Sequence, residues 1–264
     1  MIQIITGSII IIIGIYVFMK YPVKRDTKSL VLAALFVVIA AILKRLSIMV
    51  PLFGVPALKL GFEIIPMMLA GMILSPSYGF LVGIAVDIVG LIVTPTGFPF
   101  LGFTLNSVIM SCLPAIILDK TKRLSEKKLE QGLIALISII IGFISIYVLL
   151  LDTVTVSEKI VEMTWFYKIG IISICFILSI LLWRVIHYMK KKVHHNNLSM
   201  LYIWIIIVIV TEISVTFLLT PYWLQVMYEI PFMVSLFVRV IKQCVMIPLD
   251  IIVGYQLLKA LKKI

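Results

Sequence analysis

The chain has 264 residues, of which 62% are hydrophobic and only 13% are charged, and its formal net charge is +11. An ordinary soluble domain is about half apolar and about a quarter charged. One water-soluble core cannot hide such an apolar excess, so the composition excludes a soluble globular domain and indicates a membrane protein.

The apolar residues form long unbroken blocks, unlike the alternating pattern of membrane β-strands. Because every backbone amide in lipid needs a partner within its own segment, such blocks predict helices. Blocks near the spanning length of about 17–25 residues occur at 2–19, 28–48, 62–76, 79–95, 103–119, 131–151, 167–189, 199–220 and 231–258. The sequence therefore predicts an all-α, polytopic transmembrane helix bundle with about nine spans.

Most of the 23 Lys and Arg residues lie in short runs between these blocks. The runs fall in segments 20–28, 119–130 and 184–195 and at the C-terminal end. By the positive-inside rule these segments face the cytoplasm, which predicts a multi-pass cell-membrane protein with its N-terminus outside and its C-terminus inside. Block 2–19 lacks the features of a cleaved signal and is expected to be a retained helix. The same pattern argues against nucleic-acid binding.

Ionisable residues within the blocks are costly in lipid and therefore informative. They are Glu63, Asp87, Glu212, Arg239, Lys242 and Asp250. Lys242 and Gln243 follow Arg239 by three and four residues, so the three share one helix face. Two cations on one buried face repel each other unless an anion joins them. That anion is either a bound ligand or carboxylates from neighbouring helices, and the sequence leaves both readings open.

Two predicted external loops, 94–104 and 220–231, are rich in aromatic residues and proline. An aromatic belt at the lipid headgroups is one interpretation. A stacking pocket for a flat ligand is the other, since aromatic rings pair with aromatic rings. Clustering in loops stiffened by Pro and Gly favours the pocket. Segment 44–62 adds Lys44, Arg45 and Lys59 on the same side.

Catalytic interpretations find little support in the sequence. The three histidines, His187, His194 and His195, lie at the predicted cytoplasmic edge and none lies in a span. This argues against an intramembrane zinc protease or a His-based acyl transferase. The chain also has no phosphate-binding loop of the Gly-x-x-x-x-Gly-Lys-[Ser/Thr] type. We expect no catalytic residues, no metal site and no cofactor.

Two stretches resemble the substrate-binding S components of energy-coupling-factor (ECF) vitamin transporters, specifically the folate group. The first contains Pro66, Gly71, Pro76, Gly79, Gly83 and Asp87, followed by Phe98-Pro99 and Gly102-Phe103-Thr104-Leu105. The second contains Tyr222-Trp223-Leu224, Tyr228, Pro231-Phe232 and Arg239. The chain departs from the family pattern at Thr220-Pro221, where Asn-Thr is common, and at Ser75, where Gly is common.

The resemblance implies a six-helix S-component core with additions. Residues 1–20 would be an extra N-terminal transmembrane helix, 28–119 core helices 1–4, 131–189 an inserted transmembrane hairpin and 199–264 core helices 5–6. The implied function is a non-enzymatic, membrane-embedded, high-affinity subunit of a vitamin importer, with folate as the expected substrate. Its implied partners are a transmembrane T subunit and two ATPase subunits.

The resemblance also implies roles for particular residues. Aromatic side chains would stack on the rings of folate, cations would hold a carboxylate, and Thr104 and Gln243 would read polar edges. The implied substrate-binding residues are Arg45, Phe98, Phe103, Thr104, Tyr222, Trp223, Tyr228, Arg239, Lys242 and Gln243. Small residues allow helices to approach closely, and Ala33, Ala34, Ala40 and Ala41 would dock on the T subunit.

Other functions stay open at this point. The chain could be an S component for another vitamin or precursor, or a polytopic membrane enzyme of lipid metabolism. The enzyme would need acid and base residues at the cytoplasmic face, where the sequence has basic runs. A purely accessory membrane protein is a further alternative, which the polar residues of block 231–258 disfavour.

Overall fold

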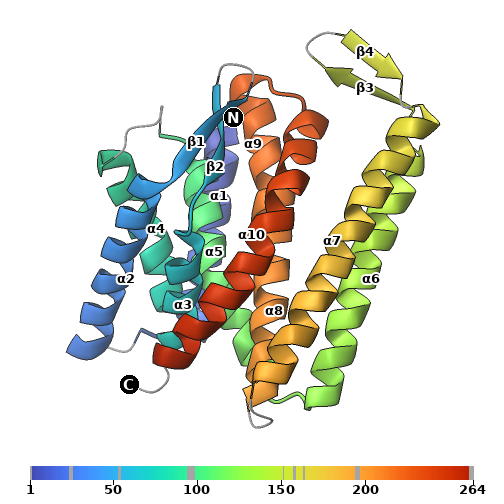
Figure 1. Ribbon diagram of the computed structural model, residues 1–264. Coiled ribbons are helices and arrows are strands. Elements are labelled where there is room, and N and C mark those ends of the chain that lie inside the picture. The colour runs from blue at the N-terminus through green and yellow to red at the C-terminus, as the bar shows by residue number, and fades with distance from the viewer. Residues whose placement is uncertain are drawn as a thin grey trace.

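Figure 1 shows the chain, as a computed structural model, to be a bundle of helices that run roughly along one common direction. The structure describes residues 2–23, 26–52, 55–93, 99–150, 152–156, 159–162, 164–193 and 197–261. In chain order the elements are α1 (Ile2–Lys20), α2 (Thr27–Leu46), β1 (Ile48–Leu52), β2 (Val55–Leu60), α3 (Ile64–Ile73), α4 (Pro76–Val93), α5 (Leu101–Thr121), α6 (Glu126–Leu150), β3 (Thr153–Val156), β4 (Lys159–Glu162), α7 (Trp165–Lys192), α8 (Leu198–Glu212), a π-helix (Ile213–Leu219), α9 (Thr220–Tyr228) and α10 (Phe232–Leu261).

Seven described helical stretches are long and apolar enough to cross a membrane. They are α1, α2, α4, α5, α6, α7 and the continuous stretch Leu198–Tyr228 that joins α8, the π-helix and α9. α10 has 30 residues and so also has the length to span, although charged side chains lie along it. The predicted all-α, polytopic bundle is confirmed.

α3 is shorter than block 62–76 predicts. Its 10 residues rise about 15 Å, which is half of a hydrocarbon core of about 30 Å. Pro76 begins α4 and restricts the preceding residue, so the two helices meet at a sharp break. All of α3 except its last residue is buried, so protein surrounds this short helix on every side.

Two short antiparallel hairpins, β1–β2 and β3–β4, lie at the same end of the bundle (Figure 1). β1 pairs with β2 from Ile48 opposite Leu60, and β3 pairs with β4 from Thr153 opposite Glu162. The apolar pattern of the sequence predicts no strands. Each hairpin lets a connection between two helices satisfy its own backbone groups.

Glycines let α3 and α4 approach α5 closely. A Cβ on Gly79 would lie 2.5 Å from the carbonyl oxygen of Ser111 on α5, and a Cβ on Gly83 would lie 2.5 Å from the Ser111 hydroxyl. That hydroxyl donates to the carbonyl of Ser107, so it leaves no unpaired polar group in the buried contact between the helices. Small residues at such contacts replace the hydrophobic driving force that lipid lacks.

α8 lies at the centre of the bundle and contacts α5, α6 and α10. Its Trp204 ring packs over Gly254 of α10, where a side chain would overlap it. The indole N–H lies 3.3 Å from the carbonyl oxygen of Asp250 and 3.1 Å from that of Ile251. These contacts fix α10 against α8 and so position the polar residues on both helices.

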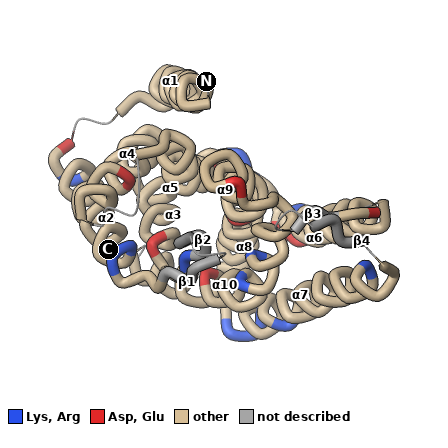
Figure 2. Tube along the Cα trace, turned by 90° about the horizontal axis from the view of Figure 1, so that it is seen from above, with Lys and Arg blue, Asp and Glu red and all other residues tan. Residues whose placement is uncertain are grey.

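α1 and the α6–α7 hairpin lie at the edges of the bundle (Figure 2). α1 packs on α4 and α5 and is held near both ends. At one end the Gln3 side chain accepts from the Leu101 N–H at 3.0 Å and donates to the Pro99 carbonyl at 3.3 Å. At the other end the Tyr21 hydroxyl donates to Asp119 at 3.1 Å.

Candidate functional site

Polar side chains are buried where α8 meets α10. Gln243 donates from Nε2 to Oε2 of Glu212 at 2.6 Å, and the Arg239 Nε donates to the Ser235 hydroxyl at 3.3 Å. Glu212 also lies within electrostatic range of Arg239 and Lys242. A carboxylate from a neighbouring helix therefore accompanies the cation pair of α10, which is one of the two arrangements that the sequence leaves open.

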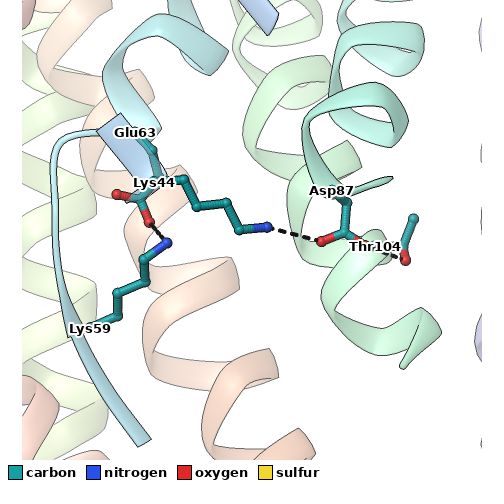
Figure 3. A network of polar contacts seen from close by, with 5 residues as sticks. All are labelled: Lys44, Lys59, Glu63, Asp87 and Thr104. Carbon is teal, nitrogen blue, oxygen red and sulfur yellow. Dashed lines mark hydrogen bonds and ion pairs between the residues drawn. The ribbon is translucent and has the colours of Figure 1, made fainter. Parts of the chain in front are cut away.

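A second polar contact joins three helices at the end of the bundle that carries β1–β2 (Figure 3). Lys44 of α2 lies 3.3 Å from Oδ1 of Asp87 on α4, and the Thr104 hydroxyl on α5 donates to Oδ2 at 2.7 Å. The Lys44 stem passes over Gly90, which has no side chain to obstruct it. Asp87 thus pairs with a cation and a hydroxyl, as a buried carboxylate requires.

Lys59 of β2 forms an ion pair with Glu63, just before α3, at 2.6 Å (Figure 3). Burial lowers the pKa of Lys59 below its ordinary value, and the Glu63 carboxylate opposes that shift. Lys44 and Lys242 also act electrostatically on Lys59. The hairpin β1–β2 therefore brings its cation into the same charged region as α2 and α10.

These contacts define what we call the polar cluster. Its members are Lys44, Lys59, Glu63, Asp87, Thr104, Glu212, Arg239, Lys242 and Gln243. The cluster mixes cations, carboxylates and neutral donors in the interior of an apolar bundle, where polar groups serve a function more often than they serve stability.

Aromatic rings pack together where the N-terminal end of α5 meets α9. Phe100 lies edge-to-face with Phe103 and with Trp223, at centroid distances of 5.7 and 5.5 Å, and Tyr222 lies 5.0 Å from Trp223. The Trp223 ring is 4% exposed, and its N–H donates to Oδ1 of Asn106 at 3.0 Å. These four rings, which we call the aromatic group, are held in fixed orientations by one another and by the buried amide.

The π-helix Ile213–Leu219 helps to set the position of α9. Thr220 donates from its hydroxyl to the carbonyl of Val215 at 2.7 Å and accepts from Nδ2 of Asn106 at 3.1 Å. Pro221 follows, and it lacks the N–H that a regular α-helix would use. π-helical segments occur frequently at functional sites.

The family model described as "ECF transporter, substrate-specific component" matches residues 28–188, which is more than half of the chain. The chain belongs to this family. It is therefore the substrate-specific component, or S component, of an energy-coupling-factor transporter, and a multi-pass membrane protein. The predicted resemblance is confirmed, and the matched range includes α6 and most of α7.

Among solved structures, a crystal structure of FolT bound with folic acid resembles the S component at 20% sequence identity and a TM-score of 0.49. The likeness covers 89% of this chain and 97% of that chain. A comparison of the sequence with curated proteins finds no match.

The structure brings the predicted binding residues of this S component together in two groups. Phe103, Tyr222 and Trp223 belong to the aromatic group, and Tyr228 packs nearby around Leu224 and Ile230 with Phe103. Thr104, Arg239, Lys242 and Gln243 belong to the polar cluster. Their roles in binding stay predictions.

Two predicted residues are not assigned to either group. Arg45 is exposed at the end of α2, whereas its neighbour Lys44 faces the bundle. Phe98 lies outside the described residues. Lys44, Lys59, Phe100 and Asn106 are not among the implied binding residues, although the sequence places Lys44 and Lys59 on the same side as the aromatic loops. The feature that distinguishes Lys44 from Arg45 is its position around the axis of α2, since adjacent side chains on a helix point about 100° apart.

The predicted docking alanines of the S component are mostly covered by its own helices. Ala33, Ala40 and Ala41 are buried, and α2 packs on α3 and α4. Ala34 is exposed. A partner helix would therefore reach Ala34 directly and the other three after a shift of α2. Docking through these residues stays a prediction.

Among the described residues no group of three or more His, Cys, Asp or Glu side chains is placed to hold a metal ion. The described cysteines, Cys112, Cys175 and Cys244, are free thiols.

Proposed function

We propose that this S component binds folate with high affinity and delivers it to an ECF importer. The observation that carries the proposal is the pair of cations on one face of α10, Arg239 and Lys242, in the interior of the bundle. A buried cation pair suits an anionic substrate. The folate-group residues of the sequence, including Phe103, Trp223 and Arg239, supply both an aromatic and a cationic component.

Folate has a flat pterin, an aryl linker and a carboxylate-bearing tail, and each part has a matching group in the protein. The aromatic group and Tyr228 would hold the rings by stacking or edge contacts. Arg239 would take a carboxylate by two parallel hydrogen bonds, and Lys242 would add a point charge. Oε1 of Gln243, which is buried without a partner among the described residues, would accept an N–H of the substrate.

The proposal includes an orientation, a set of partners and a division of the chain. The N-terminus lies outside and the C-terminus in the cytoplasm, since the end of α5, the start of α6 and the end of α7, which are rich in Lys and Arg, lie at the end of the bundle opposite β1–β2. A T subunit and two ATPases supply the energy, and the chain itself performs no catalysis. Helices α2–α5 and α8–α10 form the core, while α1 and the α6–α7 hairpin are additions to it.

Isothermal titration of the purified protein with folate, pteroate, riboflavin, thiamine and biotin tests the substrate. Pteroate lacks the glutamate tail, so we expect it to bind more weakly than folate. Arg239→Ala should weaken folate binding by at least about thirtyfold, because truncating a buried charged partner costs about 2–5 kcal/mol. It should affect pteroate much less. Arg184→Ala, an exposed arginine outside the site, is the matched control.

Folate binding that is unchanged in Arg239→Ala would remove the assignment of that residue. Selective binding of another vitamin would keep the S-component function and change the substrate, as the departure at Thr220-Pro221 allows. Binding of none of the five compounds would overturn the proposed substrate class.

A further inference from the structure

The lower ends of α6 and α7 in Figure 1 enclose a pocket that is separate from the polar cluster. Its volume is about 110 Å³, and Tyr202 of α8 closes it on the side of the core. From α7 it is lined by Trp183, Ile186, His187 and Lys190, which share one helix face. Most of the wall is therefore apolar or aromatic, with polar groups at one end.

Lys190 is the cation of this pocket. Its Nζ lies 2.9 Å from Oε1 of Glu130 on α6 and 5.9 Å from the centre of the Tyr202 ring. The Lys190 side chain remains 40% exposed. Since an ammonium has three N–H donors, Lys190 can bind an anion in addition to Glu130.

Cations exceed carboxylates around the pocket. Arg184, Lys191 and Lys192 on α7 and Lys127 and Lys128 on α6 are all exposed. Arg184 makes no ion pair with any residue that the structure describes. The surface at this end of the hairpin is therefore electropositive, and Arg184, its deepest cation, has no counter-ion among the residues that the structure describes.

The depth of Arg184 identifies the kind of anion. Arg184 precedes Lys190 by six residues, which places it about 9 Å further along the helix into the bilayer. A guanidinium at that depth extends toward the headgroup layer, where the available anion is a lipid phosphate. Basic pockets between transmembrane helices bind anionic headgroups by this chemistry.

We propose that the base of the α6–α7 hairpin is a binding site for an anionic phospholipid. Arg184 and Lys190 hold the phosphate, and an acyl chain lies along the exposed apolar wall formed by Ile134 and Trp183. The site is independent of the proposed folate site. It also gives the hairpin a lipid contact at the end where α6 packs on α8.

Native mass spectrometry of the purified protein tests this site with phosphatidylglycerol and phosphatidylcholine of identical acyl chains. We expect phosphatidylglycerol to bind preferentially. Arg184→Gln should weaken it about fivefold, the equivalent of about 1 kcal/mol for one cation near the surface. Arg184→Lys should retain binding, and Glu130→Gln should tighten it because Lys190 loses its competing carboxylate. Lys259→Gln changes an exposed cation on α10 and should have no effect.

Equal binding of the two lipids would overturn the proposal, as would an Arg184→Gln variant that binds like the unmodified protein. Displacement of phosphatidylglycerol by inorganic phosphate would also overturn it, because a free anion would then be the ligand. If Arg184→Gln does not fold, Lys190→Gln provides the same test at the other phosphate contact.

Discussion

Replacing Asp87 by leucine tests whether the contact shown in Figure 3 holds the bundle together. The substitution removes the acceptor of both Lys44 and Thr104. Breaking a buried ion pair at one partner costs about 3–5 kcal/mol, because the remaining charge stays buried. The Lys44 side chain is 21% exposed, so partial hydration favours the lower figure. A loss of about 3 kcal/mol corresponds to a fall in Tm of about 6–12 °C for a chain of this size.

Thermal unfolding of the ligand-free protein in one detergent measures the effect, and the double variant Lys44→Met/Asp87→Leu completes the cycle. Since the double variant leaves no unpaired charge, its loss should be smaller than the sum of the two single losses. Lys122→Met breaks the exposed pair with Asp119 and should leave Tm unchanged. An Asp87→Leu variant that unfolds within 2 °C of the unmodified protein (roughly 1 kcal/mol), or additive single losses, would refute the reasoning.

Three further predictions follow from the packing and charge of other residues. Gly79→Ala should lower the free energy of unfolding by about 1–3 kcal/mol, because it forces a Cβ against a backbone oxygen of α5. Gly132→Ala is the control and should leave stability unchanged, because Gly132 has open space around it. Chemical denaturation measures both effects. Asn106→Leu should cost about 1–3 kcal/mol in the same assay, because it leaves a buried indole N–H without an acceptor. Glu63→Gln should lower the pKa of Lys59 further below 10.5, because the Glu63 carboxylate raises that pKa against the effect of burial. NMR of ¹³C-methylated lysines measures this pKa, and an unchanged or raised value would contradict the prediction.

The helices were predictable from the sequence because, in lipid, each segment must satisfy its backbone hydrogen bonds locally. An apolar block that enters the bilayer must satisfy its own backbone, and only a helix does so within one segment. The connections between helices are not subject to this requirement, because water can hydrogen-bond to their amide groups. The hairpins β1–β2 and β3–β4 were therefore not predicted. The shortness of α3 was missed for a related reason, because a helix wrapped in protein does not need the length that lipid contact imposes.

The composition of the candidate site was more predictable than its geometry. Polar residues within apolar blocks and clusters of aromatic residues can be recognised in a single sequence. These patterns predicted Arg239, Gln243 and Trp223 as site residues. The pairing of Asn106 with the Trp223 indole was not visible, because it joins residues 117 positions apart. Whether Lys44 or Arg45 faces the bundle depends on the helical phase of α2. No residue pattern in the sequence marks the C-terminal end of this helix, so the phase there could not be predicted.

The pairings in the polar cluster bear on how a substrate would be selected. Lys44 is matched by Asp87, Lys59 by Glu63, and the cations of α10 have Glu212 within electrostatic range. A ligand carboxylate that binds there competes with a carboxylate the protein already supplies, so the net gain in free energy is smaller than the strength of the new contact. A neutral ligand of the same shape would bury those charges without replacing any contact. Under the proposed function, the internal carboxylates therefore contribute selectivity for an anionic substrate, while the aromatic group supplies the apolar contact area that binding strength requires.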